Sequence, residues 1–285
     1  MVYLIAGSIL FSSLLIWLFK WSDKYGVHRK LLITINYFFA SFLSFGFISF
    51  DFNRVIELSD KALWFALFIG ILFVVIFNFL AISVKKAGVT PSILAQKTSV
   101  VLPVLAGFTF FQDTLSVIKL AGLILTLPAI YLANKSEKIG DYKSSLALLA
   151  IVFFGSGSID VFLNIIQSDL GPNQVIPLFV VLFGVAGLGG LLSLFKNPPK
   201  FNLVGKPSLT WGALLGGVNF FALYFIVSAL SKNGMESSIF FPINNLGIIL
   251  FGSLGGWIIF KEKLTRINLV GLILGAISII LIALG

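Results

Sequence analysis

The chain has 285 residues, of which 58% are hydrophobic and 11% are charged, and its mean hydropathy is +1.06. Soluble domains carry about 25% charged residues, so this composition excludes a water-soluble fold and predicts one whose outer surface faces lipid. The net charge of +9 lies in short segments between apolar runs, which is typical of membrane topology and argues against a nucleic-acid-binding surface.

Two residue types that carry much enzyme chemistry are scarce. Cysteine is absent, and His28 is the single histidine. Thiol catalysis, disulfides, iron–sulfur clusters and His-rich metal sites are therefore excluded, and we expect neither a cofactor nor enzymatic activity. The first five residues carry no positive side chain, so we do not expect a cleaved signal peptide.

Ten apolar runs follow one another, each long enough to cross about 30 Å of hydrocarbon as a helix. Their length favours helices, because a membrane-spanning strand needs only about ten residues. We expect spans at residues 2–19, 31–48, 62–84, 92–111, 117–134, 146–166, 175–195, 209–230, 238–260 and 267–285. The predicted fold is an all-α membrane protein with ten transmembrane helices.

A segment at 111–125 returns at 260–274, and both copies read Phe-x-Asp/Glu-x-Leu-Ser/Thr before a Gly-Leu-Ile-Leu stretch. Asp113 corresponds to Glu262, and Ser116 corresponds to Thr265. Apolar helices resemble one another by chance, but an acidic link does not follow from apolar composition. We therefore predict two five-helix repeats, residues 1–134 and 145–285, joined by the polar link 135–145. Because five is odd, the second repeat enters the membrane from the opposite side, which makes an inverted 5+5 repeat.

The charges in the links predict an orientation. Lysine and arginine are concentrated in the odd-numbered links, which places those links in the cytoplasm and both termini outside. Lys119 lies at the start of the fifth run, where we expect its side chain to extend to the membrane interface. Asp113 and Glu262 lie next to helix N-termini, so we expect them to act as caps.

Charged side chains inside the runs are costly in lipid and so mark candidate sites. Asp160 lies well inside the sixth run with Asn164 one turn further on, and Gly155 and Gly157 before it leave room for water or a ligand. Lys97 lies inside the fourth run, next to Gln96.

Three arrangements of the two charges remain open. Lys97 and Asp160 form a direct ion pair, or they face a shared cavity from different depths, or Lys97 extends to the interface. Helix geometry starts the two head groups about 13 Å apart along the membrane normal. A cavity with a cation at one end and a carboxylate at the other suits a zwitterionic small molecule.

The ninth run contains Pro242, Asn244 and Asn245. Pro242 removes a backbone donor, and the two amides point to different sides of the helix, so at most one faces a given path. Hydrogen bonding between helices and contact with a ligand remain equally open for Asn244 and Asn245.

The ten helices, the inverted duplication and the repeated acidic link together resemble the drug/metabolite transporter superfamily, of the EamA type. Asp113 departs from the Glu that is usual in the link. The resemblance implies a carrier in the cytoplasmic membrane that works by alternating access, and it implies termini in the cytoplasm, opposite to the charge bias. Small multidrug carriers of the superfamily use a Glu in their first helix. The 2–19 run contains no carboxylate, which leaves Asp160 as the proton-coupling candidate.

The sequence therefore predicts a secondary transporter of small organic metabolites, amino acids or other zwitterions among them, with export as the expected direction. The alternatives are a channel and a drug efflux carrier. The substrate-binding candidates are Lys97, Gln96, Asp160, Asn164, Asn244 and Asn245. The expected partners are a small-molecule substrate and the lipid bilayer, with the chain a monomer or a homodimer.

Overall fold

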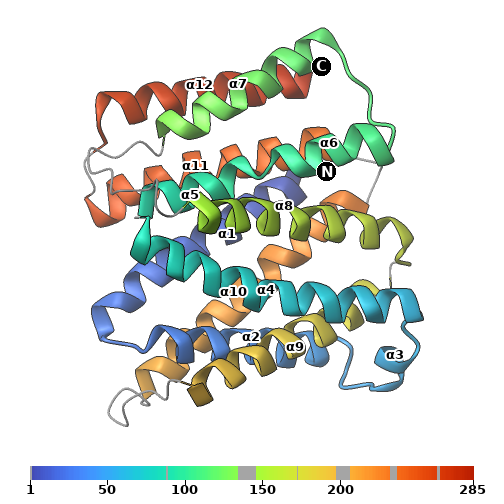
Figure 1. Ribbon diagram of the computed structural model, residues 1–285. Coiled ribbons are helices and arrows are strands. Elements are labelled where there is room, and N and C mark those ends of the chain that lie inside the picture. The colour runs from blue at the N-terminus through green and yellow to red at the C-terminus, as the bar shows by residue number, and fades with distance from the viewer. Residues whose placement is uncertain are drawn as a thin grey trace. The chain divides into compact units, whose positions relative to one another are not determined.

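The computed structural model describes residues 2–87, 89–133, 146–171, 173–196, 206–231, 236–261 and 264–285 (Figure 1). Every regular element within these ranges is a helix, which confirms the predicted all-α class. The long helices are α1 (Val2–Ser22), α2 (Arg29–Phe47), α4 (Asp60–Lys86), α5 (Val89–Thr98), α6 (Val101–Phe110), α7 (Val117–Ala133), α8 (Leu146–Asp169), α9 (Val175–Lys196), α10 (Lys206–Ser231), α11 (Ser237–Phe260) and α12 (Arg266–Leu284). A short helix α3 (Asn53–Ile56) and a single 3-10 turn η1 (Asp23–Tyr25) lie between them.

Nine spans within the described residues are long and apolar enough to cross a membrane, counting α5 and α6 as one span from Ser92 to Phe110. The helix α7 is equally apolar but has 17 residues. At about 1.5 Å per residue this length lies at the lower limit for a crossing, so α7 fits the tenth predicted span. Large apolar side chains such as Ile273 and Leu284 are 60% and 73% exposed, as expected where lipid replaces water.

The helices begin where short polar side chains cap them. The Ser116 hydroxyl accepts a hydrogen bond from the Lys119 amide at 3.0 Å and starts α7. Thr265, in extended conformation, caps the Asn268 amide and starts α12, and the Asn268 side chain caps Thr265 in return. These residues satisfy amide groups that a helix start leaves without partners. Ser116 and Thr265 are the Ser/Thr positions of the repeated link.

The fourth predicted run is not one helix, because the chain is interrupted at Ser99 and Val100 between α5 and α6. Pro103 has no amide hydrogen to donate to the Ser99 carbonyl one turn earlier, and its ring would clash with that carbonyl in a regular helix. The Leu102 amide donates to Ser99 O at 2.9 Å instead, which makes a tighter turn. Pro242 lies inside a continuous α11.

The described chain forms two compact units, and each takes helices from both sequence halves. One unit comprises residues 75–164 and 229–285, and the other comprises 2–74 and 165–228. The first unit holds every candidate site residue predicted above. The predicted repeats, 1–134 and 145–285, do not coincide with these units, and their joint at 135–145 lies outside the described residues.

In the first unit α7 and α12 run antiparallel and side by side (Figure 1). The Thr126 and Ser278 hydroxyls are hydrogen-bonded at 2.9 Å halfway along the pair. Side chains larger than glycine do not fit at its ends, since a Cβ at Gly122 would lie 2.7 Å from Ile282 and one at Gly271 would meet the Ala133 backbone. When the two halves are aligned by the repeated link, Gly122 corresponds to Gly271 and Ala133 corresponds to Ile282. The two contacts are therefore equivalent. The pair is therefore consistent with an inverted repeat.

In the second unit α2 packs along α9, where the Ser41 hydroxyl donates to Val180 O at 2.8 Å. Aromatic rings fill its core: Phe179, Phe183 and Phe220 are at most 1% exposed. Gly212 and Gly216, one helical turn apart, let α10 approach the backbone of α2.

Candidate functional site

The first polar cluster joins α5 to α11. Lys97 Nζ donates a hydrogen bond to Asn245 Oδ1 at 3.4 Å. Lys97 lies two residues before the interruption and near the middle of the span formed by α5 and α6. The structure therefore gives Lys97 a partner within the helix bundle.

Asp160 lies on α8 within electrostatic range of Lys97, but the two described side chains do not form the direct ion pair that was one of the three expectations. The close approach of α8 has a local cause, because a Cβ at Gly157 would lie 2.8 Å from Ser99 O at the interruption. We expected the small residues before Asp160 to leave room for a ligand. Instead, Leu102 occupies the space beside Gly157, and Ile76 occupies the space beside Gly155. The small residues therefore allow close packing, which carries the carboxylate toward the cation.

The remaining predicted residues have more structural surroundings. The Asn164 amide, 2% exposed, donates to the Ser237 hydroxyl at the first residue of α11. Asn244 is buried and Gln96 is half-buried. The backbone carbonyl of Gln96 accepts a hydrogen bond from the Ser99 hydroxyl at 2.5 Å. The structure thus brings Lys97, Asn245 and Asp160 together. It places Asn164, one turn after Asp160 on α8, against the first residue of α11.

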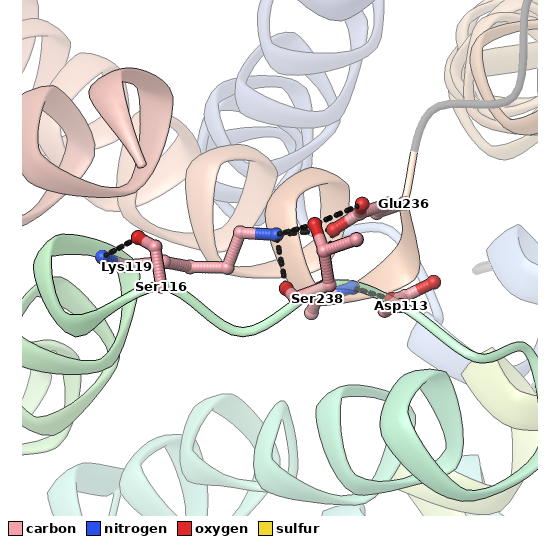
Figure 2. Close-up of polar contacts among 6 residues, drawn as sticks. Asp113, Ser116, Lys119, Glu236 and Ser238 are labelled. Atoms are coloured by element: carbon pink, nitrogen blue, oxygen red, sulfur yellow. Dashed lines mark hydrogen bonds and ion pairs between the residues drawn. The ribbon is translucent and has the colours of Figure 1, made fainter.

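A second polar cluster was not predicted from the sequence (Figure 2). Lys119 is 1% exposed, and its Nζ donates to the Glu236 carboxylate and to Thr114 O, the latter at 2.6 Å. The Thr114 hydroxyl donates to Glu236 Oε1 at 2.7 Å. The expectation that Lys119 extends to the membrane interface is wrong, because an acid more than a hundred residues later in the chain supplies a partner inside the fold.

Asp113 caps a helix, but not the one that follows it. Asp113 Oδ2 accepts from the Ser238 amide at 2.8 Å in the first turn of α11 (Figure 2). A carboxylate is favourable there because the first amides of a helix carry partial positive charge. Glu262, the corresponding acid, lies outside the described residues. The one sequence signal for this cluster was Lys119 itself, since the matching position of the other copy holds the neutral Asn268.

Burial and pairing act in opposite directions on Glu236, which lies just before α11. Burial raises the pKa of its carboxyl, but hydrogen bonds from Lys119 and Thr114 outweigh this and hold the pKa below its ordinary value. The ionised form is therefore the one that the fold stabilises.

Comparison with known proteins gives relatives along much of the chain, although no family model matches it. An uncharacterised protein of Haemophilus influenzae is 27% identical over 266 residues, which is 90% of this chain and 89% of that protein. A probable glucose uptake protein, GlcU, of Priestia megaterium is 29% identical over 192 residues, 66% of this chain and 58% of the relative. The protein of the same name from Bacillus cereus is 28% identical over 159 residues, 56% of this chain and 51% of the relative.

A solved crystal structure shares the fold, with a TM-score of 0.78 and 12% sequence identity over 99% of this chain and 96% of the other. Together with the membrane-length helices, the relatives named as uptake proteins support a multi-pass membrane transporter rather than an enzyme. The arrangement of Lys97, Asn245 and Asp160 offers such a protein hydrogen-bond donors, acceptors and opposite charges beside an interrupted helix.

Proposed function

We propose that the chain is a secondary carrier that moves small polar organic molecules across the cell membrane by alternating access. The observation that carries the proposal is Lys97, held beside an interruption in a membrane-spanning helix, hydrogen-bonded to Asn245 and close to Asp160. Interrupted helices with polar side chains near mid-membrane are typical of substrate sites in carriers. A solely structural charge pair needs no interruption.

The substrate would bind where α5, α8 and α11 meet, in contact with Lys97, Asp160 and Asn245. Gln96, Asn164 and Asn244 surround this place and are proposed as contributors to its polarity. One positive and one negative side chain suit a molecule without net charge, either a zwitterion or a neutral polyhydroxyl compound. The relatives named as glucose uptake proteins make sugars the first neutral class to test.

The inverted 5+5 repeat is part of the proposal, and its support is the antiparallel α7 and α12 pair, in which the Gly122–Ile282 contact corresponds to the Gly271–Ala133 contact. The EamA-type resemblance agrees with such a carrier. The resemblance favours export, whereas the relatives are named for uptake, so both directions are measured.

The test is transport in liposomes that contain the purified chain. Labelled glucose and labelled amino acids are offered separately, with and without a pH gradient, and then with unlabelled substrate inside. A carrier gives saturable flux that is accelerated by substrate on the opposite side. Flux that rises linearly with concentration and shows no such exchange would support the channel alternative and contradict the proposal.

A further inference from the structure

The cluster in Figure 2 joins the link between α6 and α7 to the start of α11, the helix that carries Asn245 of the candidate site. Asp113 and Thr114 lie three and four residues after the end of α6, Lys119 lies in the first turn of α7, and Glu236 directly precedes α11. Asn245 lies nine residues beyond Glu236, or about 13 Å along the helix. Contacts in the cluster therefore tie the α6–α7 link and the start of α7 to the start of α11, and the site lies further in.

The other copy shows what this position needs for structure alone. Asn268, which corresponds to Lys119, donates to the carbonyls of Leu132 and Ala133 at 3.2 and 3.0 Å, at the end of α7. Ala87, which is buried, occupies the position corresponding to Glu236. At the corresponding position a neutral amide thus bonds to the end of α7, whereas Lys119 forms a charge pair with Glu236.

The pair also has the features of a contact that opens. Glu236 lies outside the helix in extended conformation, and its side chain is 24% exposed, so water can reach it. Lys119 keeps the Thr114 carbonyl as a partner when the carboxylate leaves. Because desolvation offsets much of the attraction in a buried pair, opening it costs less than the Coulomb energy alone suggests.

We propose that the Lys119–Glu236 ion pair is a releasable latch, which holds the start of α7 against the start of α11 and opens to admit substrate from that face. The access role rests on the proposed carrier function. The opening of the ion pair does not depend on the carrier function, and it is tested without substrate.

The first experiment measures opening by thiol labelling, for which the chain is suited because it contains no cysteine. The reporter is Ser238→Cys, a buried position in the first turn of α11. The matched reporter is Ser22→Cys, also buried and at the end of α1. Each is combined with Lys119→Asn, which copies the residue of the other half, or with Glu236→Gln, and N-ethylmaleimide labelling is followed in liposomes.

The latch predicts that both substitutions raise the labelling rate at position 238 by about tenfold, as expected when a buried charge pair is lost, and leave position 22 unchanged. An unchanged rate at position 238 would overturn the proposal. An equal rise at position 22 would overturn it as well, because the pair would then stabilise the whole fold.

The second experiment tests access. In Thr114→Cys/Glu236→Cys a mercuric ion bridges the two thiols, and we expect flux to fall by at least about tenfold and to return when dithiothreitol removes the metal. Undiminished flux through the bridged protein would contradict the access role. If the unmodified chain transports nothing, the proposed function fails, and the labelling experiment still decides whether the pair opens.

Discussion

Lys97 has a role that its partners define. A cation held inside an apolar span is costly unless polar groups surround it, and Asn245 and Asp160 supply those groups. Sequence alone left three arrangements open for Lys97 and Asp160. The structure gives Lys97 an amide partner from a helix about 150 residues later in the chain, which no local pattern predicts.

Replacing Lys97 tests the site at the level of one residue. A hydrogen bond to a charged group contributes about 1.5–3 kcal/mol, so Lys97→Ala should raise the substrate concentration for half-maximal flux by about 10- to 100-fold. The control Lys24→Ala, at an exposed link position, should leave flux unchanged. Normal flux in Lys97→Ala, at normal protein amounts, would remove Lys97 from the site.

The latch predicts how stability depends on pH. The pKa of the Glu236 carboxyl is below its ordinary value in the folded chain, so Glu236 contributes stability above the unfolded pKa of about 4.3 and loses this contribution as pH falls through the folded pKa. The charged groups around it are Lys119 from α7 and Asp113 from the preceding link.

Thermal unfolding in detergent between about pH 3 and 7 measures this effect. We expect the difference in melting temperature between the unmodified chain and Glu236→Gln to be largest near neutral pH and to shrink in acid. A difference that stays constant over the range would show that Glu236 does not contribute through its charge.

Among the elements, the interrupted span of α5 and α6 has a cause in one residue. Pro103 removes the amide that would bond Ser99 O in a continuous helix. Its presence was visible in the sequence, but Pro242 and Pro128 were visible too, and both lie inside continuous helices. A proline in the sequence therefore does not by itself predict an interruption. At Ser99 the freed carbonyl lies against Gly157 of α8.

Pro103→Ala should let the amide of residue 103 donate a hydrogen bond to Ser99 O. We expect amide hydrogen exchange at residues 100–104 to slow by about tenfold. We expect flux to fall as the interruption closes, because the substrate loses access to the polar backbone beside Lys97. Pro128→Ala in α7 is the matched control and should leave flux unchanged. Full flux in Pro103→Ala with slowed exchange would show that the interruption is not needed for transport.

The close contact of α7 with α12 depends on glycine. In Gly271→Ala the new Cβ meets the Ala133 backbone, so the free energy of unfolding should fall by about 1–3 kcal/mol. Gly217→Ala is the control, since the nearest atom to its Cβ is 4.0 Å away. This change should be neutral or stabilise the helix by up to about 1 kcal/mol. Equal effects in denaturant titrations would contradict the packing argument.

For the whole molecule, the number of crossings can be checked by labelling. Lys119 and Glu236 are in contact, so they lie at the same side of the membrane and an even number of crossings separates them. The helices between them are α7, α8, α9 and α10, so the number is even only if the short helix α7 also crosses. Phe52 is exposed, and Gly171 has open space around it. Phe52→Cys and Gly171→Cys should therefore react with an impermeant thiol reagent from the same side of the membrane.

A cysteine at Tyr25 should react from the opposite side, because one crossing separates it from Phe52. Reaction of positions 52 and 171 from opposite sides would show that α7 does not cross. The same experiment decides between the orientation favoured by the charged links and the one implied by the family resemblance.

Composition and run length were enough to predict the class of fold and the helix limits to within about three residues. These follow from local physics, since run length against bilayer thickness and short polar side chains act within one or two turns. The folded structure was needed to show the partners of Lys97 and Lys119, the interruption at Ser99 and the close packing of α8 at Gly157. Each depends on which distant helix lies alongside, because a buried charge takes whatever partner the packing provides.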